Sequence, residues 1–170
     1  IRGVQQPDPK IEIVAIDDKS VRELGLYPWP RRTHARLIEL LSDAGARAIA
    51  FDIFFTERDP NHPDDDAVLG ATAERSGRTV FAIQFNRTPE GMPTDPILPI
   101  PELQRNGVGV GLANIFPEKD GATRHLPLWI RQNDTLIPSL SLAAWSAAEG
   151  VSPEDLLQRS RPPFDSRSPW

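Results

Sequence analysis

The chain has 170 residues, no Cys and 18 Pro, and its 24 acidic and 19 basic residues give a formal charge of −5. This length suits one domain with a sizeable core, and 39% hydrophobic residues exclude collagen-like, disulfide-rich and fully disordered proteins. The lack of Cys removes thiolate catalysis, Cys-ligated zinc and disulfides. No basic stripe offsets the acidic charge, so nucleic acid is not expected as a partner.

The first half of the chain has the hydrophobic pattern of alternating strands and helices. After a lead-in over residues 1–10, mostly apolar runs typical of buried parallel strands cover Ile11–Asp17, Arg47–Ile53 and Thr79–Phe85. Helices are predicted over Asp18–Leu24, Arg31–Ala44 and Ala67–Arg75, each followed by a glycine that ends it. Strand, crossover helix and parallel strand make a right-handed βαβ unit, so this half is read as β-α-β-α-β.

The second half changes pattern. Asn86–Pro101 holds five prolines and is predicted to be an ordered loop or a flap, and a short helix follows over Pro101–Arg105. Strands over Gly107–Ile115 and Thr123–Arg131 are predicted to form an antiparallel hairpin. The turn between them is placed at Asp120–Gly121. Two more helices are predicted over Pro138–Glu149 and Ser152–Gln158.

The predicted fold class is therefore α/β. A mixed, mostly parallel sheet, β-α-β-α-β followed by an antiparallel hairpin, would be flanked by helices in three layers. Residues 11–158 would form the single domain, and residues 159–170 a linker toward a transmembrane segment. The chain starts at Ile1 and not at Met, which leads us to expect an excised fragment.

Two acidic residues end predicted parallel strands, Asp17 and Asp52. Ligands of open α/β sheets bind beyond the carboxyl ends of the strands, so these carboxylates would hold a metal, pair with a cationic ligand or act as acid and base. The alternative is that each caps the following turn or accepts a local hydrogen bond.

A second group of candidates surrounds the longest predicted helix of the first half. His34 lies on its apolar stripe, either as a ligand or switch or as a hydrogen-bonded core residue. Tyr27–Arg31 is either an aromatic wall with a cation beside it, or Trp29 fills the edge of the core while Arg31 pairs with a carboxylate. The acidic stretch Asp64–Asp66 near His62 matches no calcium loop and is interpreted as a helix start.

No motif of a known catalytic or cofactor site is present. Gly107–Gly111 fails the dinucleotide pattern G-x-G-x-x-G, and we interpret it as a strand whose glycines admit a close backbone. Walker A, G-x-S-x-G and H-E-x-x-H patterns are also missing. We predict no catalytic residues, no cofactor and no metal site.

Several short stretches, taken in order, resemble one family. They are Ile13–Asp17, Tyr27–Arg31 with His34, Gly45–Phe55, Gly111–Asn114, Asp120–Gly121 with Arg124 and Pro127, and Pro138–Leu140. This ordered set resembles the CHASE sensory domain of the second type, a cyclase- and histidine-kinase-associated sensory extracellular domain, over roughly residues 10–150. Tyr27 departs from the family, which often has Trp there, and so does the long Pro-rich segment.

The resemblance implies the extracytoplasmic, periplasmic part of a bacterial membrane receptor. Transmembrane helices would flank such a domain, and the intracellular output would be a nucleotide cyclase, a diguanylate cyclase, a histidine kinase of a two-component system or a Ser/Thr kinase. The partners would be an unknown small-molecule signal and a second copy, in a homodimer through the full-length receptor. The ligand-binding candidates are Asp17, Arg31, His34, Asp52, Asn114 and Arg124.

Two other functions stay open on the sequence. One is an α/β hydrolase or phosphotransferase that uses Asp17 or Asp52 as nucleophile or metal ligand. Haloacid-dehalogenase-like enzymes need Asp-x-Asp after the first strand, and here Lys19 stands where the second Asp would be. The other is a structural or dimerisation domain that only positions its output.

Overall fold

The computed structural model describes residues 8–87, 93–118, 120–132 and 135–159. Most of the predicted lead-in and of the C-terminal linker lies outside these residues. The helices are α1 (Asp18–Leu24), α2 (Arg31–Asp43), α3 (Pro63–Ser76), the short 3-10 helix η1 (Pro101–Leu103), α4 (Leu140–Glu149) and α5 (Pro153–Arg159). The strands are β1 (Ile49–Phe51), β2 (Thr79–Arg87), β3 (Pro93–Ile97), β4 (Gly109–Leu112), β5 (Trp129–Gln132) and β6 (Thr135–Pro138).

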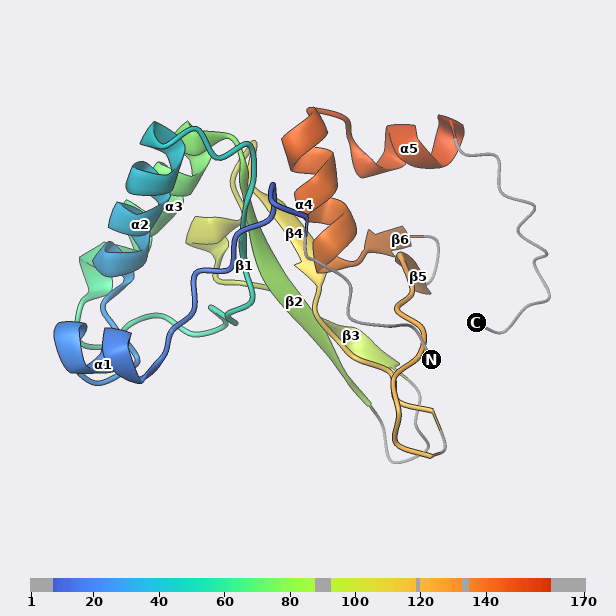
Figure 1. Cartoon of the computed structure of the whole chain (residues 1–170), viewed down its shortest axis with the longest axis horizontal. Helices are drawn as coiled ribbons and strands as arrows, with labels where there is room; N and C mark the ends of the chain where they lie inside the picture. The colour runs from blue at the N-terminus through green and yellow to red at the C-terminus, as the bar shows by residue number, and fades with distance from the viewer. Residues whose placement is uncertain (1–7, 88–92, 119, 133–134, 160–170) are drawn as a thin grey trace.

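Strand β2 is the centre of a four-stranded sheet (Figure 1). It pairs in parallel with β1, Ile49 opposite Thr79, and in parallel with β4, Val80 opposite Gly109. The C-terminal part of β2 pairs antiparallel with β3. Strands β5 and β6 form a separate antiparallel hairpin. The sheet is thus mixed, as the sequence predicts.

Helices cover both faces of this sheet. Helices α2 and α3 pack against each other beside one face, and α4 packs on β4 and β2 from the other (Figure 1). Gly111 of β4 lies against the first residue of α4, since a Cβ added there would stand 2.5 Å from the Leu140 Cα. The predicted three-layer α/β fold is confirmed, and so is the prediction that a glycine of Gly107–Gly111 admits a close backbone.

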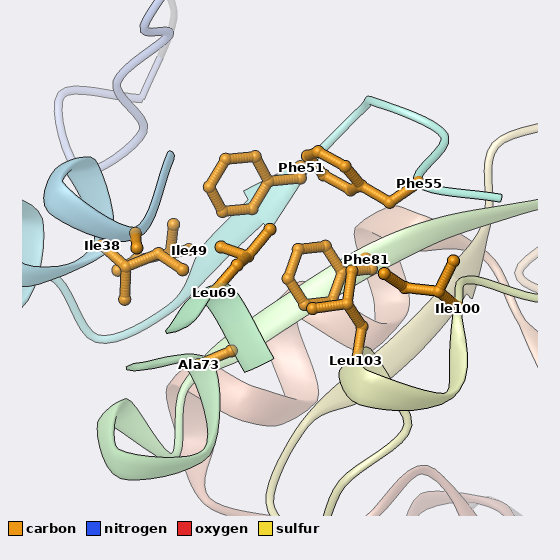
Figure 2. Close-up of a cluster of buried hydrophobic side chains, with 10 residues drawn as sticks. Ile38, Ile49, Phe51, Phe55, Leu69, Ala73, Phe81, Ile100 and Leu103 are labelled. Atoms are coloured by element: carbon orange, nitrogen blue, oxygen red, sulfur yellow. The ribbon is translucent and has the colours of Figure 1, made fainter. Parts of the chain in front are cut away.

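The core on the α2–α3 side is built from aromatic and aliphatic side chains (Figure 2). The rings of Phe51 and Phe81 stack with centroids 5.4 Å apart, and Phe55 meets Phe81 edge-on at the same distance. Burying one such side chain stabilises a fold by about 1.5–3 kcal/mol. This cluster fixes the positions of β1, β2 and the segment after β1.

The predicted helices are present, although α4 begins at Leu140 and the residue predicted to start it, Pro138, ends β6. Asp17 accepts a hydrogen bond from the Ser20 backbone N–H at the start of α1. The Ser152 hydroxyl accepts from the Asp155 N–H at the start of α5. Helix α3 begins earlier than predicted, at Pro63, and the acidic stretch is its first turn. These ends are set by local chemistry, which explains why the sequence predicts them.

The first predicted strand is wrong. Ile11–Asp17 pairs with no strand among the described residues, and four of its apolar side chains, those of Ile11, Ile13, Val14 and Ile16, are between 41% and 89% exposed. The Ala15 carbonyl accepts a hydrogen bond from the Ser20 hydroxyl, which ties the segment to α1. A run of β-branched residues shows that a segment is compatible with a sheet, but it does not determine whether another strand pairs with it.

The predicted hairpin is also wrong. The turn at Asp120–Gly121 forms, with Gly121 at φ +79° and the Asp120 carboxylate accepting from the Ala122 N–H. In the part of the chain that the structure describes, the two strands predicted beside that turn do not pair with each other: β4 lies parallel to β2, and the hairpin is β5–β6, farther along the chain. Local turn chemistry predicts the turn, whereas strand pairing is decided by distant residues.

The Pro-rich segment contains a strand that the sequence analysis did not predict. Within the described residues, strand β3 pairs only with β2, Gln84 opposite Ile97. Edge strands tolerate proline because their outward positions need no N–H donor. Residues 88–92 lie outside the described residues.

Candidate functional site

Two consecutive arginines at the start of α2 face two consecutive buried carboxylates at the start of α3. Arg32 Nη2 lies 2.8 Å from Asp65 Oδ1, and the Arg32 backbone N–H donates to Asp65 Oδ2. Arg31 Nε lies 3.4 Å from Asp66 Oδ1. The other oxygen of Asp66 accepts from the Asp59 N–H at 3.0 Å. These contacts join the N-terminal turns of the two helices.

Arg31 also reaches the segment that follows β1. Its guanidinium carbon lies 4.7 Å from the centre of the Phe55 ring, a cation–π contact. Its Nη2 donates to the Glu57 carbonyl at 3.1 Å. The side chain is only 14% exposed. Of the two sequence-based interpretations, pairing with a carboxylate is the one that the contacts support.

The side chain of His34 is surrounded by aromatic rings. Its ring stands 5.4 Å from that of Phe55 and 5.9 Å from that of Phe51, edge-on to both, and 6.3 Å from the tilted ring of Trp29. Burial, and secondarily the charge of Arg31, lowers the pKa of His34 to about 4. The imidazole is therefore neutral at physiological pH. Its Nε2 has no hydrogen-bond partner within the described part of the chain.

Two of the other candidates stabilise local structure. The exposed carboxylate of Asp17 caps α1, and the hydrogen bond from the Ser20 N–H lowers its pKa. The Asn114 amide pairs with the backbone of Phe85, accepting from its N–H at 2.7 Å and donating to its carbonyl at 3.0 Å. Asn114 thereby extends the β2–β4 pairing by a side chain.

The remaining candidates lie on the surface. Arg124 pairs with Asp120 and Glu118, and both acids raise its pKa. Asp52 follows β1 and is exposed. Over the described ranges, no hydrogen bond or ion pair joins Asp17, Asp52, Asn114 or Arg124 to the Arg31–His34 cluster, and no group of three His, Asp or Glu side chains is placed to hold a metal.

A groove of ≈640 Å³ runs along β4 on the other side of the molecule. Its walls come from β2, β4, β6, α4 and the start of α5, together with Pro96 of β3 and Leu98 just after that strand. Most of this lining is apolar: Val80, Ile83, Leu98, Val108, Val110, Leu136, Ile137, Ala143 and Ala147. None of the six predicted ligand-binding residues lines it.

Small residues on both walls create this groove. Gly107 and Gly109 lie on the β4 side, and α4 presents Ala143, Ser146 and Ala147 toward it. In the sequence, the groove corresponds to a strand with alternating glycines and a later helix of small residues. A search for charged candidate residues does not reveal such a pattern. The Ser146 hydroxyl is buried in this lining and has no hydrogen-bond partner among the described residues.

This lining suits a binding site for a small molecule. Small-molecule sites are typically concave, mostly apolar and about 300–1,000 Å³ in volume, with a few polar groups that fix orientation. Here Ser146 supplies a hydroxyl, and Glu154 at the rim is the charged residue of the lining. The groove therefore suits a small, largely apolar molecule with one hydrogen-bonding group.

The fold is that of an α/β domain with helices on both faces of a mixed sheet. The sequence profile of the CHASE2 domain matches residues 1–168, nearly the whole chain, and the chain belongs to the CHASE2 family. CHASE2 domains are extracellular sensory domains and not catalytic ones. No curated protein and no solved structure gives a significant match. Among the described residues, no helix is both long and apolar enough to cross a membrane.

Proposed function

We propose that this chain is the extracytoplasmic sensing domain of a bacterial transmembrane receptor, and that its signal is a small, largely apolar molecule bound in the groove between β4 and α4. Membership of the CHASE2 family supports the sensory part of this proposal. The intracellular output would be a nucleotide cyclase, a diguanylate cyclase, a histidine kinase or a Ser/Thr kinase, as the family resemblance implies.

The observation that carries the groove assignment is the Ser146 hydroxyl. It is buried at the groove without a hydrogen-bond partner among the described residues. A buried polar group left unpaired costs about 1–3 kcal/mol. Because this oxygen has almost no accessible surface, α4 has to shift before a bound hydroxyl or carbonyl group pairs with it, and that pairing would recover the free energy while the molecule covers the apolar wall.

Binding in this groove would change how the two C-terminal helices, α4 and α5, are arranged. The lining includes Val151, Ser152 and Pro153 at the start of α5 as well as α4. A molecule that contacts both helices shifts the equilibrium between their arrangements by as much as its affinities for the two differ. A complete switch, from 1:99 to 99:1, needs a difference of about 5.5 kcal/mol.

The cluster at α2 and α3 has a different role in this proposal. Arg31 and His34 hold those helices against the aromatic core. The hydrolase alternative gains no support, because the carboxylate of Asp17 is engaged in a helix cap and CHASE2 domains are sensory.

Thermal melting with 1-octanol as the probe tests the groove. Octanol is expected to raise the melting temperature of the wild type and of Ser141→Ala, at an exposed residue outside the groove whose hydroxyl contacts that of Ser139. The rise should be smaller in Ser146→Ala, which loses the hydroxyl, and absent in Ala147→Trp, which fills the groove. An unchanged response in Ala147→Trp would place octanol elsewhere and refute the assignment.

A further inference from the structure

One acidic side chain lies in the lining of the groove between β4 and α4. Glu154, in the first turn of α5, is the charged residue of that lining, and no Lys, Arg or His among the described residues contributes to it. Glu154 is exposed. Its carboxylate has no ion pair and no hydrogen bond within the described part of the chain. The groove therefore combines an apolar wall with a negative charge that the described residues leave unpaired.

The arginines closest in sequence to the lining are held by other groups. Arg78 donates to the backbone carbonyls of Ser76 and Ala46. Arg105 Nη1 lies 3.2 Å from the carboxylate of Glu74. Neither arginine lines the groove, so neither supplies a counterion there. As far as the described residues show, the place of that counterion is open to a bound molecule.

The end of α4 adds partial negative charge to the part of the groove next to α5. Helix α4 has ten residues and is followed by Gly150, which lines the groove together with Ala147. The C-terminal end of a helix carries about half an elementary negative charge, which favours a nearby cation. The partial positive charge at the start of α5 is offset by the two acidic residues of its first turn, Glu154 and Asp155. The electrostatic environment of the groove therefore favours a cation.

Glu154 also has a structural role that requires no ligand. An acidic residue in the first turn of a helix is stabilising by itself. Asp155, one position later, meets the same need and lies outside the lining of the groove. The two residues therefore separate the two roles, because both lie in the first turn of α5 and only Glu154 lines the groove.

We propose, on the basis of the signal site proposed above, that the signal is a cationic amphiphile whose alkyl chain covers the apolar wall and whose protonated amine pairs with Glu154 at the rim. Neutral and anionic amphiphiles of the same length would bind less tightly. An ion pair at the rim costs little, because both charges keep part of their water there, whereas full burial of two charges carries a large desolvation penalty.

Three eight-carbon probes that share a hydroxyl end test this proposal. The other end is a methyl group in 1-octanol, an amine in 8-amino-1-octanol and a carboxylate in 8-hydroxyoctanoate. At pH 7 the amine is protonated and the carboxylate is ionised, since the ordinary pKa values of Lys and Glu are about 10.4 and about 4.3. Because the hydroxyl end is the same, differences in affinity report on the other end.

Isothermal titration calorimetry gives the three dissociation constants. The amine should bind the wild type about two- to five-fold more tightly than octanol, which is the gain of an exposed ion pair, and the carboxylate should bind more weakly than octanol. Salt at about 1 M should remove most of this difference, because the Debye length there is about 3 Å. Without a carboxylate partner, the ammonium group would weaken binding to an apolar groove.

Substitutions at the two acidic residues locate the ammonium group. Glu154→Gln should bind the amine no more tightly than octanol, and Glu154→Lys should prefer the carboxylate. Asp155→Asn removes an equal charge from the same helical turn and should keep the preference for the amine. All three variants should fold like the wild type, because both residues are exposed.

The outcomes distinguish this inference from the signal site on which it rests. If octanol binds in the groove but the amine binds no more tightly, or if Glu154→Gln keeps the preference, the cationic class is wrong and the signal site stands. An equal loss of preference in Asp155→Asn would show a general attraction by acidic charge and contradict the pairing with Glu154. If octanol does not bind, or binds Ala147→Trp unchanged, the signal site is wrong and this inference falls with it.

Discussion

At the scale of single residues, His34 connects the aromatic core to the Arg31–Asp66 pair. The folded chain holds its pKa at about 4, below the ordinary value of 6.5. Between these two pH values the unfolded chain binds a proton that the folded chain does not. The free energy of unfolding should therefore fall as the pH drops from about 6.5 to about 4, by about 3 kcal/mol.

Urea denaturation at pH 7 and pH 4.5 measures this loss. His34→Gln should remove most of it, whereas His125→Gln, at an exposed histidine, should keep it. The lowered pKa values of the carboxyls of Asp17 and Asp59 act below this window, since they lie under the usual 3.8. An equal loss in both histidine variants would show that His34 does not cause it.

Asp66 carries a second prediction at this scale. Its carboxylate is buried, lies beside Arg31 and accepts from the Asp59 N–H. Removing one partner of a buried ion pair leaves the other charge uncompensated, so Asp66→Asn should lower the free energy of unfolding by about 3 kcal/mol. Asp64→Asn, at the exposed neighbour in the same helical turn, is the control and should change it little. Equal effects would point to the charge at the helix start.

At the scale of elements, the packing of α4 on β4 depends on Gly111. A Cβ there would stand 2.5 Å from the Leu140 Cα and 3.0 Å from the Ala143 Cβ, and a helix backbone cannot give way cheaply. Gly111→Ala should cost about 1–3 kcal/mol of unfolding free energy. At Gly109 the added Cβ meets a Val80 methyl at 3.1 Å, so Gly109→Ala should cost less. The reverse order in urea denaturation would contradict the packing described.

Elements also differ in how far the sequence predicts them. Helix α1 is predicted correctly because its cap, Asp17, and its terminating glycine, Gly25, lie next to it. Ile11–Ile16 has the composition of a buried strand like β2, yet β2 has neighbouring strands on both sides and the segment has none among the described residues. Pairing is non-local, so composition alone cannot decide it.

The same reasoning applies to the candidate sites. The sequence suggests a carboxylate partner for Arg31, but only the packing of α2 on α3 selects Asp66. The groove forms because Gly107 and Gly109 have no side chain and the residues of α4 that face them have small ones. A sequence search for reactive side chains therefore does not reveal this apolar groove.

At the scale of the whole molecule, a three-layer domain carries an apolar groove along one side of its sheet, and β1 has a free edge as far as the described residues show. The groove touches α4 and α5, and the free edge lies at the opposite end of the strand order. In the proposed account, the groove binds the signal.

Labelling of living cells tests the sensor account most directly. Lys19→Cys introduces a thiol at an exposed position of α1 in a domain without Cys, and the parent protein without this substitution gives the background. In the complete gene product expressed in its host, a maleimide that cannot cross the cytoplasmic membrane should label this thiol in intact cells. Labelling only after the cytoplasmic membrane is opened would place the domain inside and contradict the account.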